Sequence, residues 1–485
     1  MIFASSGGDA LMVTTGFQEG GIHVSDGGSE VVIDKWPPDL AGVLARPGRK
    51  ALRITNTWPD DTLDRLMPFR DQIDSIIVEA DIPDLSALST FSRLRALSIS
   101  GFAAIDFAAL PLLETLRLSG HFGNLGRCDS LRVLSIDGGG LSDLRALAGL
   151  DQLAELEVAG TPLRSLAGLE MLKSLRRLSL FDLPLPNIDG LEQATSLSQI
   201  GLHRLGRLRS IAPLAALSGL KMLEIDGSKK ITDLERLGDT VGMEDLKLTG
   251  TPLSSVEFLS RLRLLRFLTL HNVGRLPSLA FLGSLDKLET LALAENTVVE
   301  NGDLSVLLTM PALRIVSFTQ RRHYSHHLDG VQAVLTERGT LGPGSFDNYM
   351  SRQWAALLQT RNHQLGRMMV GSVLRDTLTY GEQEIPARLG QYAIGAAEVL
   401  ARLRGYHRER TPHSAPVDQW VVDHSFEPNP ETVALAVETL DRLLRAPSGL
   451  LTLWMKRGQA EAWIEAVNDL RSRLTRGAQS TGASS

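Results

Sequence analysis

The sequence predicts an α/β repeat protein, in which short parallel strands line the concave face of a horseshoe-shaped solenoid, followed by an all-α helical domain. Two observations predict this architecture. An apolar motif returns roughly every 22 residues from about residue 70 to about residue 325. Beyond Gly339 the apolar spacing changes to the period of an α-helix.

Length and composition limit the class of protein. A chain of 485 residues exceeds what one compact core usually organises, so we expect an elongated repeat domain and a further domain. The hydrophobic fraction of 43% and the charged fraction of 22% are ordinary globular values. The formal net charge is -6 and no long Lys/Arg run occurs, so we expect no nucleic-acid partner.

Targeting signals and cysteine usage predict the compartment. The N-terminal residues MIFASSGGDALMVTTG lack the basic stretch and sustained apolar core of a signal peptide. No window approaches the roughly 18 uninterrupted apolar residues of a membrane span, so we expect no membrane partner. The single cysteine, Cys128, cannot form an intramolecular disulfide. We therefore expect a cytoplasmic protein.

The recurring motif is L-x-x-L-x-L, the pattern of leucine-rich repeats. Its x-L-x-L part predicts a short strand whose alternate side chains point to opposite faces. The leucines point inward, and because no repeat can bury them alone, neighbouring repeats must stack. The apolar spacing of three that follows a strand, as in Leu163, Leu166 and Leu169, predicts an irregular or 3₁₀ return path. Copies begin at Leu94, Leu113, Leu131, Leu153, Leu175, Leu197, Leu220, Met243, Leu265, Leu288 and Leu313, with degenerate earlier copies at Leu52/Ile54 and Ile73/Ile76/Val78.

The domain boundaries follow from these patterns. Residues 1–50 are predicted to cap the solenoid with a β-hairpin, because two apolar runs flank the turn-forming stretch 25–29. Residues 51–338 form the solenoid, which ends in a cap helix over 329–337. A helical domain is expected over 340–475 and a disordered tail over 476–485.

Several signals describe the helical domain. Asn429, Pro430 and Glu431 supply an N-cap, a proline at the first helical position and an acidic first turn. An apolar stripe has the spacing of one helix face, and four tryptophans are expected to be core anchors. These residues are Val433, Val437, Leu440 and Leu444, with Trp354, Trp420, Trp454 and Trp463.

The repeats closely resemble bacterial leucine-rich-repeat proteins of the short, internalin-like kind. That family carries a ladder of asparagines after its strands. Here the position holds Asn296 in one repeat, hydroxyl residues at Thr161, Thr251 and Ser228, and apolar residues such as Phe102 and Val273 elsewhere. The resemblance implies an irregular horseshoe that binds other molecules.

The C-terminal region is similar to the bacterial DUF4259 helical domains. Residues 342–348, Gly-Pro-Gly-Ser-Phe-Asp-Asn, are followed by Trp354, and residues 396–399, Ala-Ala-Glu-Val, precede Leu403-Arg404-Gly405. Trp420, Trp454 and Trp463 fall in similar tryptophan-containing segments. The chain departs from the family pattern at Leu341, Tyr349 and Gln353. The resemblance implies a helical module of uncharacterised function.

The concave face is the predicted functional surface, because it is broad, rigid and not used for core packing. Acidic residues gather at Asp137/Glu155/Glu157 and at Glu224/Asp226/Asp245, with Arg177 and Phe181 between them. Carboxylates mixed with aromatic residues and an arginine are typical of a protein-binding patch, and the alternative is a merely solvated face. The predicted binding residues are Asp137, Glu155, Glu157, Arg177, Phe181, His203, Glu224, Asp226, Asp245, Lys247, Phe267 and His271.

We therefore predict a non-enzymatic scaffold or adaptor that uses no cofactor and recognises another protein, for which the acidic clusters favour a basic surface. Two alternatives come from other classes. One is an immunity protein that neutralises a toxin, and the other is an enzyme hidden in the helical domain, whose polar groups would be Asp347, Asn348 and Glu398. No phosphate-binding glycine loop, G-x-S-x-G, HExxH or paired CxxC motif occurs.

Three smaller features have competing interpretations. His323, His326 and His327, with Asp329 nearby, either bind a metal ion or belong to a solvated cap. Asp347 or Asn348 is expected to cap a helix that starts near residue 349. Cys128 is expected to be a small buried residue, since no histidine lies near it in the sequence to activate a thiol.

Overall fold

The computed structural model divides the chain into two compact units. One comprises Met1–Ala312 with Ser317–Ser325, and the other Leu313–Val316 with His326–Ser485. The described residues are 22–24, 30–33, 40–44, 50–55, 58–100, 105–120, 125, 128–339, 345–346, 351, 354–355, 357–358, 363–407, 414–424 and 428–476. The predicted tail over 476–485 lies outside them except for residue 476.

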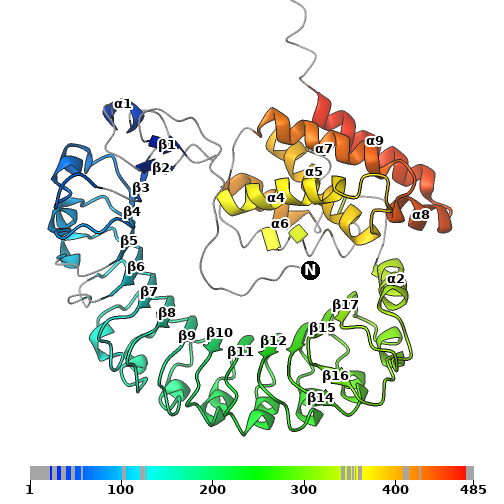
Figure 1. The fold of residues 1–485 in the computed structure, drawn as a ribbon, viewed down its shortest axis with the longest axis horizontal. Coiled ribbons are helices and arrows are strands. Elements are labelled where there is room, and N and C mark those ends of the chain that lie inside the picture. The colour runs from blue at the N-terminus through cyan, green and yellow to red at the C-terminus, as the bar shows by residue number, and fades with distance from the viewer. Residues whose placement is uncertain are drawn as a thin grey trace, which may run out of the picture. The chain divides into compact units, whose positions relative to one another are not determined.

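A long sheet organises the first unit (Figure 1). β1 (Ile22–Val24) pairs antiparallel with β2 (Glu30–Ile33), and β2 then pairs in parallel with β3 (Ala51–Ile54). The following strands each add in parallel, in chain order, to the previous strand of the sheet. They are β4 (Ser75–Val78), β5 (Ala96–Ser100), β6 (Thr115–Ser119), β7 (Val133–Asp137), β8 (Glu155–Ala159), β9 (Arg177–Phe181), β10 (Gln199–His203), β11 (Met222–Asp226), β12 (Asp245–Thr249), β13 (Phe267–His271) and β15 (Thr290–Ala294).

The alternation along each strand separates the core from the surface. In β8, Leu156 and Val158 are buried, whereas Glu155 and Glu157 point outward. Full burial of a leucine or valine side chain contributes about 1.5–3 kcal/mol. This contribution depends on the next strand, since the side chains of one repeat are covered by those of its neighbours. The predicted leucine-rich-repeat solenoid is therefore confirmed.

Short helices form the return path of the repeats. After most strands of the solenoid the described chain enters a 3₁₀ segment, such as Arg145–Leu147, Leu169–Met171 or Ala212–Ala216, that buries one or two apolar side chains. Leu163, Leu166 and Leu169, spaced by three, are all buried. Leu163 and Leu166 lie in an irregular segment and Leu169 begins the 3₁₀ segment, which confirms the predicted irregular or 3₁₀ return path. β14 (Arg275–Leu276) and β16 (Val298–Val299) add a small second sheet, and β17 (Ile315–Phe318) lies beside β15.

The residue after each strand of the long sheet from β7 to β15 adopts the left-handed conformation. Its φ lies between +51° and +74° at Gly138, Gly160, Asp182, Arg204, Gly227, Gly250, Asn272 and Glu295. In this conformation the backbone N–H of the turn residue extends the hydrogen bonding between neighbouring strands. For example, the N–H of Asp182 donates to the carbonyl oxygen of His203 at 3.0 Å. Glycine adopts this conformation without penalty, whereas Asp182 and Arg204 do so at a cost. Arg204 Nε donates to Asp182 Oδ1 at 2.8 Å and links these two turns.

The predicted asparagine ladder is wrong at one position. Asn296 is exposed and donates to the side chain of Asn272 at 3.2 Å. The following residue, Thr297, is the buried one, and its hydroxyl donates to the carbonyl of Leu270 at 2.7 Å. The turn after β15 is one residue longer than the turns after strands such as β12, so the inward position is residue 297 and not residue 296. Thr161, Ser228 and Thr251 are buried as expected.

The second unit is a helical domain. Its described helices are α2 (Leu328–Gly339), α4 (His363–Leu378), α5 (Ala387–Leu403), α6 (Ala415–Asp423), α7 (Pro430–Leu443), α8 (Gly449–Lys456) and α9 (Ala460–Thr475); α1 (Leu40–Leu44) belongs to the first unit. α5 packs against α4, α6, α7, α8 and α9, and is buried along most of its length. No described helix is long and apolar enough to cross a lipid bilayer.

Two local predictions for the helical domain are confirmed. Asn429 caps α7, because its side chain accepts a hydrogen bond from Glu431 N at 2.9 Å. The four tryptophans are all buried, with exposed fractions of 4% or less. In α2, Gln332 accepts from Val316 N at 3.1 Å and donates to Arg314 O at 3.0 Å, so this helix caps the segment that enters β17. The boundary between solenoid and helical domain near 338–340 stays a prediction.

A buried ion network crosses the core of the helical domain. Glu398 of α5 receives two hydrogen bonds from Arg473 of α9, at 2.9 and 2.8 Å. Arg402 lies 3.2 Å from the same carboxylate and also pairs with Asp418 of α6. Ser345 Oγ donates to Glu398 at 3.0 Å. Glu398, Arg402 and Arg473 are each at most 4% exposed, so the charges depend on one another for compensation.

Replacing Arg473 by methionine is expected to destabilise the helical domain by about 3 kcal/mol, because it removes the bidentate partner of a buried carboxylate. Urea unfolding followed by tryptophan fluorescence measures this, since four of the six tryptophans lie in this domain. Arg471→Met is the matched control. Arg471 lies in α9 as well, and its replacement breaks an exposed pair with Asp441 of α7, so this change should cost less than about 1 kcal/mol. Equal losses in the two variants would contradict a structural role for the network.

Candidate functional site on the concave face

The structure places all twelve predicted binding residues at outward positions of seven consecutive strands. β7 carries Asp137, β8 carries Glu155 and Glu157, β9 carries Arg177 and Phe181, and β10 carries His203; β11 carries Glu224 and Asp226, β12 carries Asp245 and Lys247, and β13 carries Phe267 and His271. Parallel pairing aligns these positions in three rows that run across the sheet.

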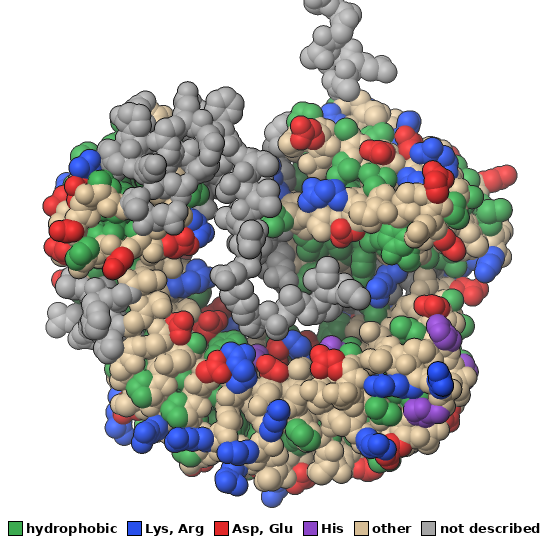
Figure 2. All heavy atoms as spheres, in the orientation of Figure 1, with side chains coloured by type: hydrophobic (Ala, Val, Ile, Leu, Met, Phe, Trp, Pro, Cys, Tyr) green, Lys and Arg blue, Asp and Glu red, His purple; other side chains and the backbone are tan. Residues whose placement is uncertain are grey.

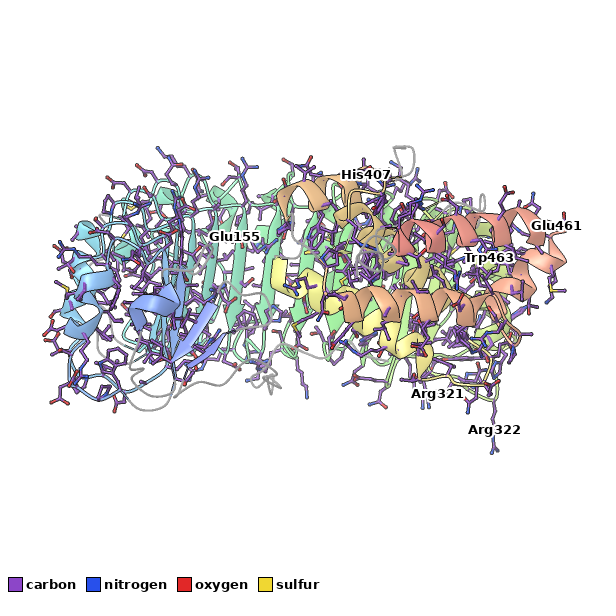
Figure 3. The ribbon with its side chains drawn as sticks, turned by 90° about the horizontal axis from the view of Figure 1, so that it is seen from above. Glu155, Arg321, Arg322, His407, Glu461 and Trp463 are labelled. Atoms are coloured by element: carbon purple, nitrogen blue, oxygen red, sulfur yellow. The ribbon has the colours of Figure 1, made fainter. Side chains whose placement is uncertain are left out.

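One end of the surface is held by a chain of polar contacts. Arg177 lies 3.3 Å from Glu155 on one neighbouring strand and donates to Gln199 on the other at 2.8 Å. Glu157 in the middle row accepts a hydrogen bond from Ser135 at 3.2 Å. Glu155 projects from its strand in Figure 3. Arg177 therefore neutralises Glu155 and leaves Glu157 as an exposed carboxylate.

The centre of the surface carries a stacked aromatic pair. Phe181 and His203 face one another across β9 and β10, with ring centroids 4.1 Å apart and planes inclined by 5°. Gly201 provides the space for this arrangement. A Cβ atom at residue 201 would lie 2.6 Å from Nε2 of His203, so the imidazole folds back over a position that has no side chain. His203 is consequently only 7% exposed.

Carboxylates flank the imidazole on the next two strands. Gly201 and His203 are opposite Glu224 and Asp226 of β11 in the register of the sheet. Lys247 Nζ donates to Glu224 at 2.6 Å. Burial, and then the charge of Glu224, raise the pKa of Asp245 to about 6, although Lys247 acts in the opposite direction. Part of this carboxyl population is therefore protonated near neutral pH.

The two histidines of the surface are predominantly neutral at pH 7. Burial lowers the pKa of His203 below its ordinary value of 6.5, although Glu224 and Asp226 raise it. Burial also lowers the pKa of His271, with Glu295 acting against it and Lys247 acting with it. A neutral imidazole is both a hydrogen-bond donor and an acceptor, so His203 can bind polar groups of either kind.

The outward positions of β7 to β13 contain six carboxylates and two cations, Arg177 and Lys247. Figure 2 shows acidic side chains along the inner margin of the solenoid, whereas most of the lysines and arginines visible in that view follow its outer margin. The remaining predicted residues lie at the ends of the rows. Phe267 contacts the guanidinium of Arg266 at 5.2 Å, and Asp137 lies beside Gly160.

Gly201 lies in the middle row of the concave face but is not among the residues predicted to bind. The signal was present, because the middle strand position carries a side chain in the neighbouring repeats, for example Ser179 and Glu224. A glycine at an outward strand position marks a site where another group approaches the backbone. The sequence pattern does not show that this group is the side chain of His203.

The histidine segment near residue 325 is used for local contacts. His323 Nε2 lies 2.9 Å from the carbonyl oxygen of Val299, and its ring contacts Tyr324. His327 lies 3.6 Å from Asp329, and both side chains are exposed. Within the part of the chain that the structure describes, no group of three or more His, Cys, Asp or Glu side chains is arranged to hold a metal ion.

The candidate reactive groups are engaged elsewhere or lie outside the described residues. Cys128 is buried, as expected, and burial raises the pKa of its thiol to about 11. Glu398 belongs to the ion network of the helical domain. Asp347 and Asn348 lie outside the described residues. A groove of about 740 Å³ is lined by residues of α7 and α9, among them Val433, Val437 and Leu474, and Glu398 does not line it.

The strand register and the stacked repeats define the first unit as a leucine-rich-repeat protein. Residues 339–466 match the family model described as a domain of unknown function, DUF4259, which confirms the resemblance inferred from the sequence. No curated protein matches the chain.

Similar solved structures include bacterial repeat proteins. An internalin, InlF, of Listeria monocytogenes str. 4b F2365 is 21% identical, over 60% of this chain and 87% of its own, with a TM-score of 0.47. A leucine-rich-repeat protein of Leptospira interrogans is 15% identical over 63% and 92%, with a TM-score of 0.38. The functional domain of InlJ from Listeria monocytogenes is 15% identical over 58% and 70%, with a TM-score of 0.37.

The raised pKa of Asp245 predicts a pH-dependent gain of stability on its substitution by asparagine. Folding raises the pKa from the ordinary 3.8 to about 6, so ionising this carboxyl opposes folding. Asp245→Asn should therefore be more stable than the natural chain by about 1–2 kcal/mol above pH 6, and the gain should vanish as pH falls to about 4. Urea unfolding at a series of pH values measures the difference.

Asp151→Asn serves as the control for this series, because Asp151 is an exposed carboxylate in the turn before β8. We expect Asp151→Asn to change the free energy of unfolding by less than about 0.5 kcal/mol. A loss of stability in Asp245→Asn at pH 8 would show that this carboxylate is favourably paired in the folded protein.

Proposed function

We propose that the chain is a non-enzymatic scaffold or adaptor that recognises another protein through the concave face of β7 to β13. The observation that carries this proposal is the set of outward side chains on these strands, an excess of carboxylates around a stacked aromatic pair. Neither the partner nor a cofactor is needed to hold this surface, since its backbone is fixed by the sheet.

The size of the surface supports a protein partner. Three outward positions on each of seven strands present twenty-one residues. A stable protein interface uses about 20–30 residues on each side. Seven strands at a spacing of about 4.8 Å extend over about 29 Å, which is wide enough for a folded partner. A small ligand would contact only a fraction of these positions.

The charge of the surface supports a basic partner. Six carboxylates against two cations create a negative potential, which accelerates encounter with a positive surface and weakens as salt is added. Arg177 and Lys247 are each paired with a neighbouring carboxylate, so they fix side chains within the surface. The aromatic pair provides apolar contact area in the centre of the charged rows.

In our proposal the helical domain either extends this interface or acts as the effector end of the adaptor. We also propose that the protein acts in the cytoplasm and binds neither nucleic acid nor membranes. The single cysteine and the absence of a long basic run in the sequence support this assignment. The ion network of Glu398 and Arg473 supports a structural role for the central α5–α9 contact.

Charge reversal on the concave face tests the proposal. Tagged full-length chain captures partners from lysate of the source organism, and the affinity of each captured protein is then measured with purified components. Glu157→Lys and Glu224→Lys are each expected to weaken binding of the specific partner at least about tenfold, because each replaces an attraction by a repulsion in the interface.

Two matched controls place the same change off the concave face. Asp151→Lys lies in the repeat of Glu157, and Glu235→Lys lies in the 3₁₀ segment that follows Glu224; both residues are exposed. These controls should retain the partner within about twofold. A partner that the concave variants bind as tightly as the natural chain does, or that the controls release equally, rejects the concave interface.

A further inference from the structure

We propose that the groove between α7 and α9 binds a small amphipathic carboxylate, an organic acid with an unbranched apolar chain. The apolar chain lies along α7 in this assignment, and the carboxylate contacts the guanidinium of Arg404. The inference goes beyond the proposed function, because it concerns the helical domain and does not require the concave face to bind a protein.

The groove has the size and the lining of a small-molecule site. Its volume is about 740 Å³, and such sites usually measure about 300–1,000 Å³. Apolar side chains form its walls, namely Val433, Ala434 and Val437 of α7, Leu474 of α9, and Pro428. The two valines are half-buried and Ala434 is exposed, so an apolar ligand can cover them further.

The groove is elongated along α7. Pro430 and Asp441 both line it and are eleven residues apart in this helix, which corresponds to about 16 Å. The apolar positions between them, Val433, Ala434 and Val437, have the spacing of one helix face. An unbranched chain can contact this whole face, whereas a compact ligand would cover only part of it.

One end of the groove carries a cation with unused hydrogen-bond donors. Leu403 lines a small cavity together with Pro428, so the adjacent Arg404 lies at the N-terminal end of α7. The guanidinium of Arg404 donates to the carbonyl oxygens of Leu474 and Arg476, the latter at 2.9 Å. These bonds use two of its five N–H donors, and among the described residues no carboxylate is paired with it.

The acidic residues of the groove lie toward its other end. Asp441 is paired with Arg471 at 2.6 Å, and Nε of Arg445 donates to the carbonyl oxygen of Asp441 at 3.1 Å. Glu438 is exposed and lies about two turns along α7 from its first residue. Glu438 repels an anion, whereas Arg404 and the positive end of the α7 dipole attract one. The charges therefore favour a ligand whose carboxylate lies at Arg404.

Calorimetric titration of the full-length chain tests this site. The probes are dodecanoate, dodecyltrimethylammonium and dodecyldimethylamine oxide, which share one chain and carry an anionic, a cationic and a neutral head. Each is used below the concentration at which it forms micelles. One dodecanoate should bind per chain with a dissociation constant of about 1–100 μM, and the other two probes at least about tenfold more weakly. Decanoate should also bind about tenfold more weakly than dodecanoate, because two fewer methylenes are buried.

Two variants examine the walls and the cation separately. Ala434→Trp fills the groove from an exposed position and should abolish binding. Arg404→Gln should weaken dodecanoate about tenfold and leave the amine oxide unchanged, so the preference for the anion is lost. A merely structural defect would weaken both probes.

Matched controls make the same changes outside the groove. Val422→Trp on α6 and Arg375→Gln on α4 alter exposed residues that do not line it, and both should bind dodecanoate within about twofold of the natural chain. Circular dichroism shows whether each variant is folded.

Several outcomes would overturn the carboxylate site. They are equal binding of the three probes, several dodecanoate molecules per chain, unchanged binding in Ala434→Trp, or no binding at about 1 mM dodecanoate. A dimer in light scattering that Ala434→Trp separates would show that a second copy fills the groove instead. A captured protein that only Ala434→Trp releases would assign the groove to a partner helix. Release of a partner by Glu157→Lys and Glu224→Lys is independent of all these results, so the proposed function is judged separately.

Discussion

The structure depends on the fact that one repeat cannot bury its own leucines. Each strand of the solenoid directs alternate side chains inward, and these side chains are covered only when the next strand lies in register beside it. The stability of the solenoid therefore requires the correct strand register, since a shift of the strand pairing by one residue would turn every buried leucine of that strand outward. The outward positions take no part in this requirement, which is why their residue types differ from repeat to repeat.

Register also explains how distant residues form one surface. Glu155, Arg177 and Gln199 are each 22 residues apart in the chain, yet they are joined by direct contacts because they occupy the same place on adjacent strands. Residues 201, 203, 224 and 226 are brought together in the same way. The geometry of the candidate site is thus set by the core, while its chemistry is set by residues that the core does not constrain.

The sequence was sufficient for the strands, the return path and the outward rows, since each follows from a spacing that repeats many times. It was insufficient where a residue's role depends on a side-chain conformation. Two examples are the position of the His203 imidazole over Gly201 and the ion pair of Lys247 with Glu224, since both depend on side-chain rotamers. Thr297 replaces Asn296 because one turn is longer. Glu398 meets Arg473 75 residues later in the chain, a contact that no local pattern encodes.

The turns after β9 and β10 affect how firmly neighbouring repeats of the solenoid are joined. These two neighbouring strands end in the stacked rings of Phe181 and His203 and continue into the linked turns of Asp182 and Arg204, so side chains join them at two successive positions. The turns after β7, β8, β11 and β12 have glycine at the left-handed position, so no side chain at that position can link one turn to the next. Neighbouring strands that are joined by side chains at two successive positions, in addition to their backbone hydrogen bonds, should resist separation more than strands followed by glycine turns. The spacing of β9 and β10, and with it the stacked pair, should therefore persist while repeats with glycine turns, such as those of β7 and β8, adjust to a partner.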